Sequence, residues 1–208
     1  MQEFFAKGGL VLWIIVGLSA LAVAIIIERL LYFRRISTDE QKLYSRAKAS
    51  LEKAHFDEAL AICDQNLSPF SALLRTGIEN RHYPEQTQRE MLKDAAAQEE
   101  PGLERHISAL GTIANIAPLI GLLGTVTGTM KALGVLGRFG AVSDPSVIAA
   151  GVSEALINTV GGIIVAVLSV IFYNYLVNKV NLIILKLESQ VTNLITMVNA
   201  SESRGSRT

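Results

Sequence analysis

Charged residues are scarce in this sequence, and they are unevenly placed. Asp, Glu, Lys and Arg make up 18% of the 208 residues, whereas half of the residues are hydrophobic and the formal net charge is zero. Nearly all of the charge lies between Glu28 and His106 or after Lys179. Long uncharged blocks of this kind are typical of a membrane protein with a soluble insert. No basic patch is interleaved with aromatic residues, so nucleic-acid binding has little support.

Residues that carry enzymatic or metal chemistry are also few. The single cysteine, Cys63, cannot form an intrachain disulfide, which fits a reducing compartment. The histidines, His55, His82 and His106, are far apart and lack metal-ligand spacing. No glycine-rich loop ends in Lys followed by Ser or Thr, and no nucleophile lies beside an evident base. We therefore expect neither an enzyme nor a protein that holds a metal ion or another cofactor.

No segment alternates apolar and polar residues as a β-strand does, so we expect an all-α integral membrane protein. Three uncharged runs are long enough to cross a bilayer as helices. The predicted order is an external N-terminus (1–9), a first span (10–31), a cytoplasmic helical domain (32–106), a second span (107–133), a short external loop (134–146), a third span (147–178), and a cytoplasmic helix with a flexible tail (179–208).

The orientation follows from the charges that flank the first span. Arg29, Arg34 and Arg35 follow its uncharged run (residues 8–27), whereas Lys7 alone precedes that run, which places the N-terminus outside and the C-terminus inside. An alternative reading is a secretory signal peptide, because Ala20-Leu21-Ala22 resembles a small-residue cleavage site. The apolar run continues to Ile27 before the basic flank, which favours an uncleaved helix.

Local signals divide the soluble parts into helices. Ser37 and Glu40 form a capping box that predicts a helix start. Ser68-Pro69 is typical of a cap followed by a first-turn proline, and a further helix is predicted after Pro84. The Ser/Arg/Gly composition after Asn199 predicts a disordered tail.

The strongest functional signal is Glu154, because it is the one Asp, Glu, Lys, Arg or His residue between Pro145 and Asn178. A charged residue in the middle of a membrane costs roughly 2.5–3.5 kcal/mol, so such residues mark ion or proton pathways by default. The alternative without a role in ion movement is a hydrated glutamate at the membrane surface, since Glu154 follows the helix start at Pro145 by only about two to three turns.

Small residues form a stripe on each of the last two spans. On the third span they recur at steps of three and four. On the second span they include a GxxxG match at residues 124–128, which contains Thr125. Such stripes indicate close helix packing and predict a surface that faces something other than lipid. Packing of the second span against the third within one chain is the alternative. The small or hydroxylated stripe residues are Ala155, Thr159, Gly162, Ala166, Ser169 and Tyr173 on the third span and Ala114, Ala117, Gly121, Gly124 and Gly128 on the second.

Two of these segments carry a family resemblance. Residues 117–128 (APLIGLLGTVTG) resemble the second-span motif of the ExbB/TolQ/MotA family of ion-driven motor subunits, and residues 150–159 (AGVSEALINT) are similar to its third-span motif. Tyr173-Asn174 matches the end of that motif. The departure is Val167-Leu168, where many relatives have isoleucine and then proline. Three spans, rather than the four typical of MotA, favour the ExbB/TolQ branch.

The resemblance implies a homopentameric ring in the bacterial inner membrane. The ring would enclose the single-span helix of an ExbD/TolR-like partner, whose aspartate carries the proton, and a TonB- or TolA-like protein would receive the work. Glu154, Thr125 and Thr159 would lie on the ion path. The small residues Ala155, Gly162, Ala166, Ser169, Gly121, Gly124 and Gly128 would face the partner or the lumen.

Other functions stay open at this stage. The chain could be a structural scaffold that holds a single-span partner and conducts nothing, or an ion-driven stator of a motility or gliding machine. A self-contained channel or transporter is disfavoured, because the sequence has one acid in its spans and no inverted repeat.

Overall fold

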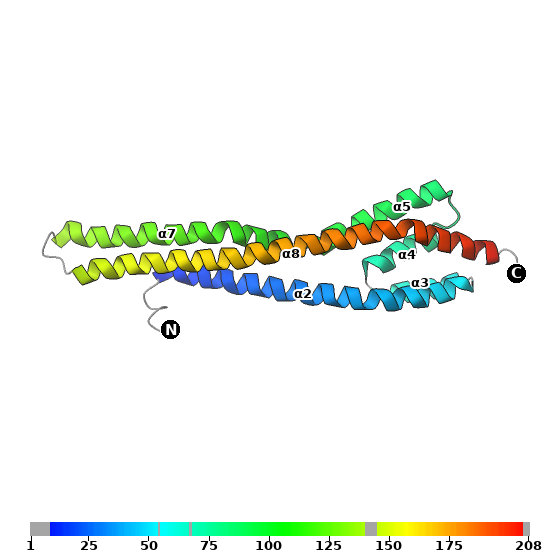
Figure 1. The fold of residues 1–208 in the computed structure, drawn as a ribbon, viewed down its shortest axis with the longest axis horizontal. Helices are drawn as coiled ribbons and strands as arrows, with labels where there is room; N and C mark the ends of the chain where they lie inside the picture. The colour runs from blue at the N-terminus through cyan, green and yellow to red at the C-terminus, as the bar shows by residue number, and fades with distance from the viewer. Residues whose placement is uncertain (1–8, 54, 67, 140–144, 206–208) are drawn as a thin grey trace. The chain divides into compact units, whose positions relative to one another are not determined.

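The computed structural model describes residues 9–53, 55–66, 68–139 and 145–205. Within these ranges every regular element is an α-helix and no strand occurs, so the predicted all-α class is confirmed for this part of the chain. The helices in chain order are α2 (Gly9–Glu52), α3 (Phe56–Asp64), α4 (Pro69–Glu79), α5 (Glu85–Gln98), α6 (Glu100–Glu104), α7 (Ile107–Phe139) and α8 (Pro145–Gly205), and Figure 1 labels all of them except α6.

Within the part of the chain that the structure describes, three helices are long and apolar enough to cross a membrane, as predicted. The candidate stretches are Gly9–Ile36 in α2, Ile107–Gly134 in α7 and Ile148–Glu202 in α8. The last exceeds the roughly 20 residues that one bilayer crossing needs, so only part of α8 is required to span. The predicted span boundaries and the side of the N-terminus stay predictions.

Two of the predicted helix ends are wrong. The capping box at Ser37 predicts a helix start, yet α2 continues without a break from Gly9 to Glu52. Extending a helix adds one hydrogen bond per residue, whereas a new helix needs an unfavourable nucleus, so the existing helix overrides the local signal. Helix α8 also continues past Asn199 to Gly205, with Val198 and Ser201 buried. That burial explains why the polar composition there does not produce disorder before Gly205.

The chain divides into two compact units. The membrane unit comprises Met1–Glu28 and His106–Leu176, and the helical unit comprises Arg29–Arg105 and Val177–Thr208. Helices α2, α3, α4, α5 and α8 each contribute to the core of the helical unit. Its fully buried large side chains include Leu43 and Leu51 from α2, Phe70, Leu73, Leu74 and Ile78 from α4, Leu92 from α5 and Leu194 from α8.

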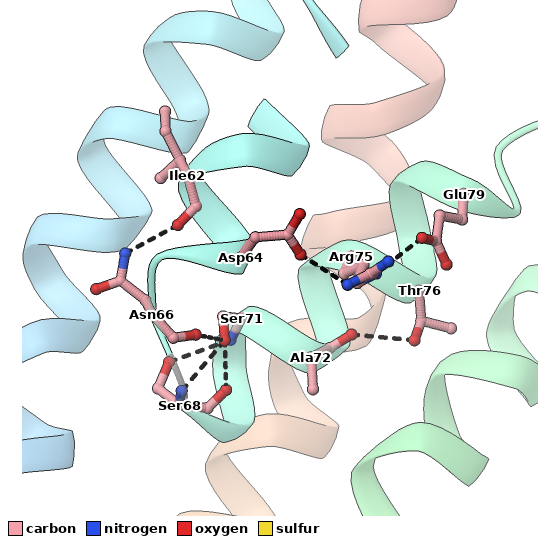
Figure 2. A network of polar contacts seen from close by, with 9 residues as sticks. All are labelled: Ile62, Asp64, Asn66, Ser68, Ser71, Ala72, Arg75, Thr76 and Glu79. Atoms are coloured by element: carbon pink, nitrogen blue, oxygen red, sulfur yellow. Dashed lines mark hydrogen bonds and ion pairs between the residues drawn. The ribbon is translucent and has the colours of Figure 1, made fainter. Parts of the chain in front are cut away.

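A pair of serines caps the start of α4 in the helical unit (Figure 2). The backbone N–H of Ser71 donates to the Ser68 hydroxyl, and the backbone N–H of Ser68 donates to the Ser71 hydroxyl, both at 3.2 Å. Pro69 fills the first turn, where a backbone N–H would lack a helical partner anyway. Nearby, the Arg75 guanidinium pairs with Asp64 at 2.6 Å and Glu79 at 2.8 Å. The helix start predicted at Ser68-Pro69 is confirmed.

Candidate functional site

The small-residue stripes of α7 and α8 face each other within one chain. A Cβ atom placed on Gly121 would lie 3.0 Å from the backbone oxygen of Asn158. A Cβ atom placed on Gly162 would lie 2.5 Å from the backbone oxygen of Ala117. A side chain at either position would force the two backbones apart, so glycine permits their close approach. We call this contact the α7–α8 seam.

Most of the predicted stripe residues are buried in this seam or beside it. Gly124, Gly128, Ala155, Ala166 and Ser169 all have little exposed surface in the single chain. Packing between the second and third spans, the alternative that the sequence left open, accounts for the small size of Gly124, Gly128 and Ala155, which contact the other helix. Their contact with a partner or a lumen stays a prediction.

Polar side chains also lie in the α7–α8 seam. The Thr159 hydroxyl on α8 donates to the backbone oxygen of Gly121 on α7 at 3.0 Å, which links the two helices directly. Asn158 is 2% exposed and its side chain packs on Gly124. Within the described residues, the side-chain oxygen of Asn158 is buried without a hydrogen-bond partner, as is that of Ser169 further along α8. A buried unpaired group costs about 1–3 kcal/mol, so the seam carries polar atoms at the expense of stability.

Glu154 lies where three helices of the membrane unit meet. Its side chain is 25% exposed, and its carboxyl oxygen Oε1 lies 4.0 Å from Nζ of Lys131 on α7. The same oxygen would lie 2.7 Å from a Cβ atom placed on Gly9, the first residue of α2. The start of a helix carries partial positive charge, so both neighbours attract a carboxylate. The sequence identified the acid, but it assigned no role to Lys131.

Gly9 is the member of this group that sequence reasoning missed. Its backbone has φ of +57°, a left-handed conformation that residues other than glycine rarely adopt. The adjacent carboxyl of Glu154 leaves no room for a Cβ atom either. Two independent restrictions therefore require glycine here. The only signal in the sequence is a glycine ahead of an apolar run, and helical spacing does not connect it to Glu154.

Thr125 is the third residue predicted on the ion path. Its hydroxyl donates to the backbone oxygen of Leu122 at 2.6 Å, and its own backbone oxygen accepts from the Thr129 hydroxyl at 2.7 Å. Thr125 is half-buried on α7, and Thr159 is half-buried on α8. Because each of these hydroxyls uses its proton on a nearby carbonyl, the oxygen lone pairs are what each offers to a further group.

Ionisable groups with a displaced pKa lie in the helical unit. Burial, assisted by the neighbouring Asp64 carboxylate, raises the pKa of the Cys63 thiol to about 11. Burial likewise raises the pKa of Glu99. Cys63 is therefore a protonated, poorly reactive thiol at neutral pH. Among the described residues, no group of three or more His, Cys, Asp or Glu side chains could hold a metal ion.

Comparison of the sequence with known protein families gives a match among membrane transport proteins. Residues 65–189, more than half of the chain, match the model of the MotA/TolQ/ExbB proton channel family. This range contains both quoted motifs, Glu154, Thr125 and Thr159.

Individual relatives agree with the family match. An ExbB-like biopolymer transport protein of Synechocystis sp. is 31% identical over 169 residues, which cover 80% of each chain. An ExbB homolog of Methanothermobacter thermautotrophicus is 29% identical over 187 residues, or 86% of this chain and 63% of that protein, so this chain spans less than two thirds of it. Biopolymer transport protein ExbB of Aquifex aeolicus is 38% identical over 107 residues, or 51% of this chain and 71% of that protein.

Proposed function

Because this chain belongs to the MotA/TolQ/ExbB proton channel family, we propose that it is the channel-forming subunit of a proton-driven motor in the bacterial inner membrane. It is a multi-pass membrane protein with three long apolar helices. The observation that carries the proposal is the carboxyl of Glu154 on the third of these helices, next to Lys131 and Gly9. An ionisable group is retained in a membrane span at a cost, which a role in ion movement explains.

The ion path in this proposal runs past Glu154, Thr125 and Thr159. Glu154 supplies a negative charge that attracts protons, and the threonine hydroxyls supply polar atoms in an otherwise apolar stretch. The proton itself is carried by an aspartate on the single-span helix of an ExbD/TolR-like partner. Lys131, at 4.0 Å from Glu154, balances the carboxylate while the partner's aspartate is neutral.

The assembly in this proposal is a homopentamer around the partner helix, with the N-terminus outside, the C-terminus inside and work passed to a TonB- or TolA-like protein. Apolar side chains that the single chain leaves exposed support an assembly within the bilayer. On α7 these are Leu119, Leu122, Leu123, Val126, Met130 and Leu133. They offer surfaces for lipid or for neighbouring chains, since the α7–α8 seam already buries most of the small residues.

Proton uptake by proteoliposomes that contain the purified complex tests the role of Glu154. Under an imposed membrane potential, we expect Glu154→Leu to lower uptake to the leak of empty liposomes. Glu154→Gln should leave partial uptake, because the amide keeps a polar group beside the partner's aspartate. Glu188→Gln removes an exposed acid from the part of α8 that belongs to the helical unit, and it should leave uptake unchanged. Full uptake by Glu154→Leu in an intact complex would refute the assignment.

A scaffold that holds the partner and conducts nothing is the second candidate. The observation in its favour is that the small-residue stripes are used for packing within one chain. The same proteoliposomes distinguish the two functions. A scaffold predicts uptake at the level of empty liposomes for the unsubstituted complex, and equal partner recovery with every Glu154 variant.

A further inference from the structure

A cavity of about 130 Å³ lies inside the helical unit, between α2, the start of α4 and α8. Its walls are largely apolar and include the buried side chains of Phe33, Ile36, Phe70 and Leu187. An engineered apolar cavity of about 150 Å³ stays dry and binds benzene. This cavity is therefore large enough for a short length of hydrocarbon and too small for a whole lipid chain.

Two lysines of α8, Lys179 and Lys186, line the same cavity. They are seven residues apart, which places both on one face of the helix. Lys186 is exposed and Lys179 is half-buried. An ammonium group binds phosphate as a point charge. The cavity thus combines apolar side chains on the inside with two ammonium groups at its edge.

The residues around the cavity also mark the end of two apolar runs. Lys179 is the first charged residue after Glu154, and Phe33 and Ile36 flank Arg34 and Arg35 behind the first span. Lysine at the end of a span keeps its stem in hydrocarbon and its ammonium among the lipid headgroups. With the predicted third span ending at residue 178, the cavity edge is therefore at the depth where lipid phosphates lie.

We propose that this cavity binds an anionic phospholipid. The phosphate lies between Lys179 and Lys186, and part of one acyl chain lies against Phe33, Ile36 and Phe70. Basic pockets between membrane helices recognise lipid headgroups in this way. A headgroup with net negative charge is selected, because a zwitterionic headgroup brings its own cation to the lysines. The site does not depend on the proposed motor function.

The test measures lipid contact at the edge of the cavity in the full chain. The single native tryptophan is removed with Trp13→Phe, and a reporter is introduced with Leu182→Trp, because Leu182 lines the cavity and is 63% exposed. Brominated phosphatidylglycerol and brominated phosphatidylcholine are compared as quenchers in phosphatidylcholine bilayers. A matched reporter, Ile164→Trp, lies at a position of the membrane unit that is 55% exposed and reports on bulk lipid.

We expect phosphatidylglycerol to be preferred at position 182 and not at position 164. Each lysine should contribute about fivefold to this preference, so Lys179→Gln and Lys186→Gln should each reduce it by that factor. Lys93→Gln removes an exposed lysine of α5 and should leave it unchanged. Ile183→Phe narrows the cavity and should also reduce the preference, although both lysines remain.

Three results would overturn the proposal. The first is equal quenching by the two lipids at position 182, or a preference that the lysine variants do not change. The second is an unchanged preference in Ile183→Phe, because the acyl chain would then lie outside the cavity. The third is loss of the preference when inorganic phosphate is added in millimolar amounts, which would identify the site as one for a free anion.

Discussion

Two glycines of the membrane unit differ in what surrounds them, and this difference tests the α7–α8 seam at the scale of one residue. A Cβ atom on Gly162 would meet the backbone oxygen of Ala117, whereas a Cβ atom on Gly17 of α2 would have no atom within 4 Å apart from those of its own stretch of helix. Alanine is favoured over glycine inside a helix by about 0.5–1 kcal/mol. We therefore expect Gly17→Ala to be neutral or stabilising.

For Gly162→Ala the clash should outweigh that gain, because overpacking costs typically 1–3 kcal/mol. The free energy of unfolding, measured by titrating the detergent-solubilised protein with SDS, should fall for Gly162→Ala only. Equal behaviour of the two variants would mean that the seam is looser than its backbone distances indicate.

The acid of the candidate site could be predicted from the sequence, but its neighbours could not. Glu154 is conspicuous because one carboxyl stands in a long uncharged run. Its contacts with Lys131 and Gly9 join residues from three helices. Those contacts depend on how the helices cross and at which level, and the spacing within each helix carries no information on either. Helical spacing did predict the stripes, although it could not decide between packing within a chain and contact with a partner.

At the scale of one helix, the serine cap of α4 has a measurable effect on local stability. Ser68→Ala removes the acceptor for the backbone N–H of Ser71, and loss of such a cap costs about 1 kcal/mol. Hydrogen exchange of the α4 amides, followed by mass spectrometry on the full chain, should become roughly fivefold faster. Ser189→Ala, at an exposed position of α8 outside any cap, should leave exchange of α4 unchanged. Unchanged exchange of α4 in Ser68→Ala would contradict the role of the cap.

Helix ends were predictable where a helix begins from a loop. Ser68 caps α4, which begins at Pro69, and Pro84 precedes α5, as their residue types indicate. The same kind of signal failed at Ser37, because that residue lies inside a helix that is already formed. The composition after Asn199 also failed, because burial of Ser201 depends on packing in the helical unit. Local sequence signals thus determined where a helix begins or ends only at positions where no longer-range contact opposed them.

At the scale of the whole molecule, the direction of insertion can be tested with introduced cysteines. Cys63 itself is a poor reporter, because it is buried and its thiol pKa is raised to about 11. In a Cys63→Ala background, Gln86→Cys lies at an exposed position of α5 and Ser146→Cys at an exposed position near the start of α8. A membrane-impermeant maleimide should label position 146 in intact cells and position 86 only after permeabilisation. The opposite pattern would reverse the predicted topology.

The closeness of α7 and α8 has a mechanical consequence. Van der Waals attraction is short-ranged, and a gap of 0.5–1 Å already forfeits a quarter to a half of it. Two helices in contact through glycines therefore have almost no intermediate separation at which they remain bound. The pair of helices then moves as one rigid unit. In the proposed ring, movement is then confined to the borders between neighbouring α7–α8 pairs, where bulky side chains slide against each other more freely than glycine on backbone.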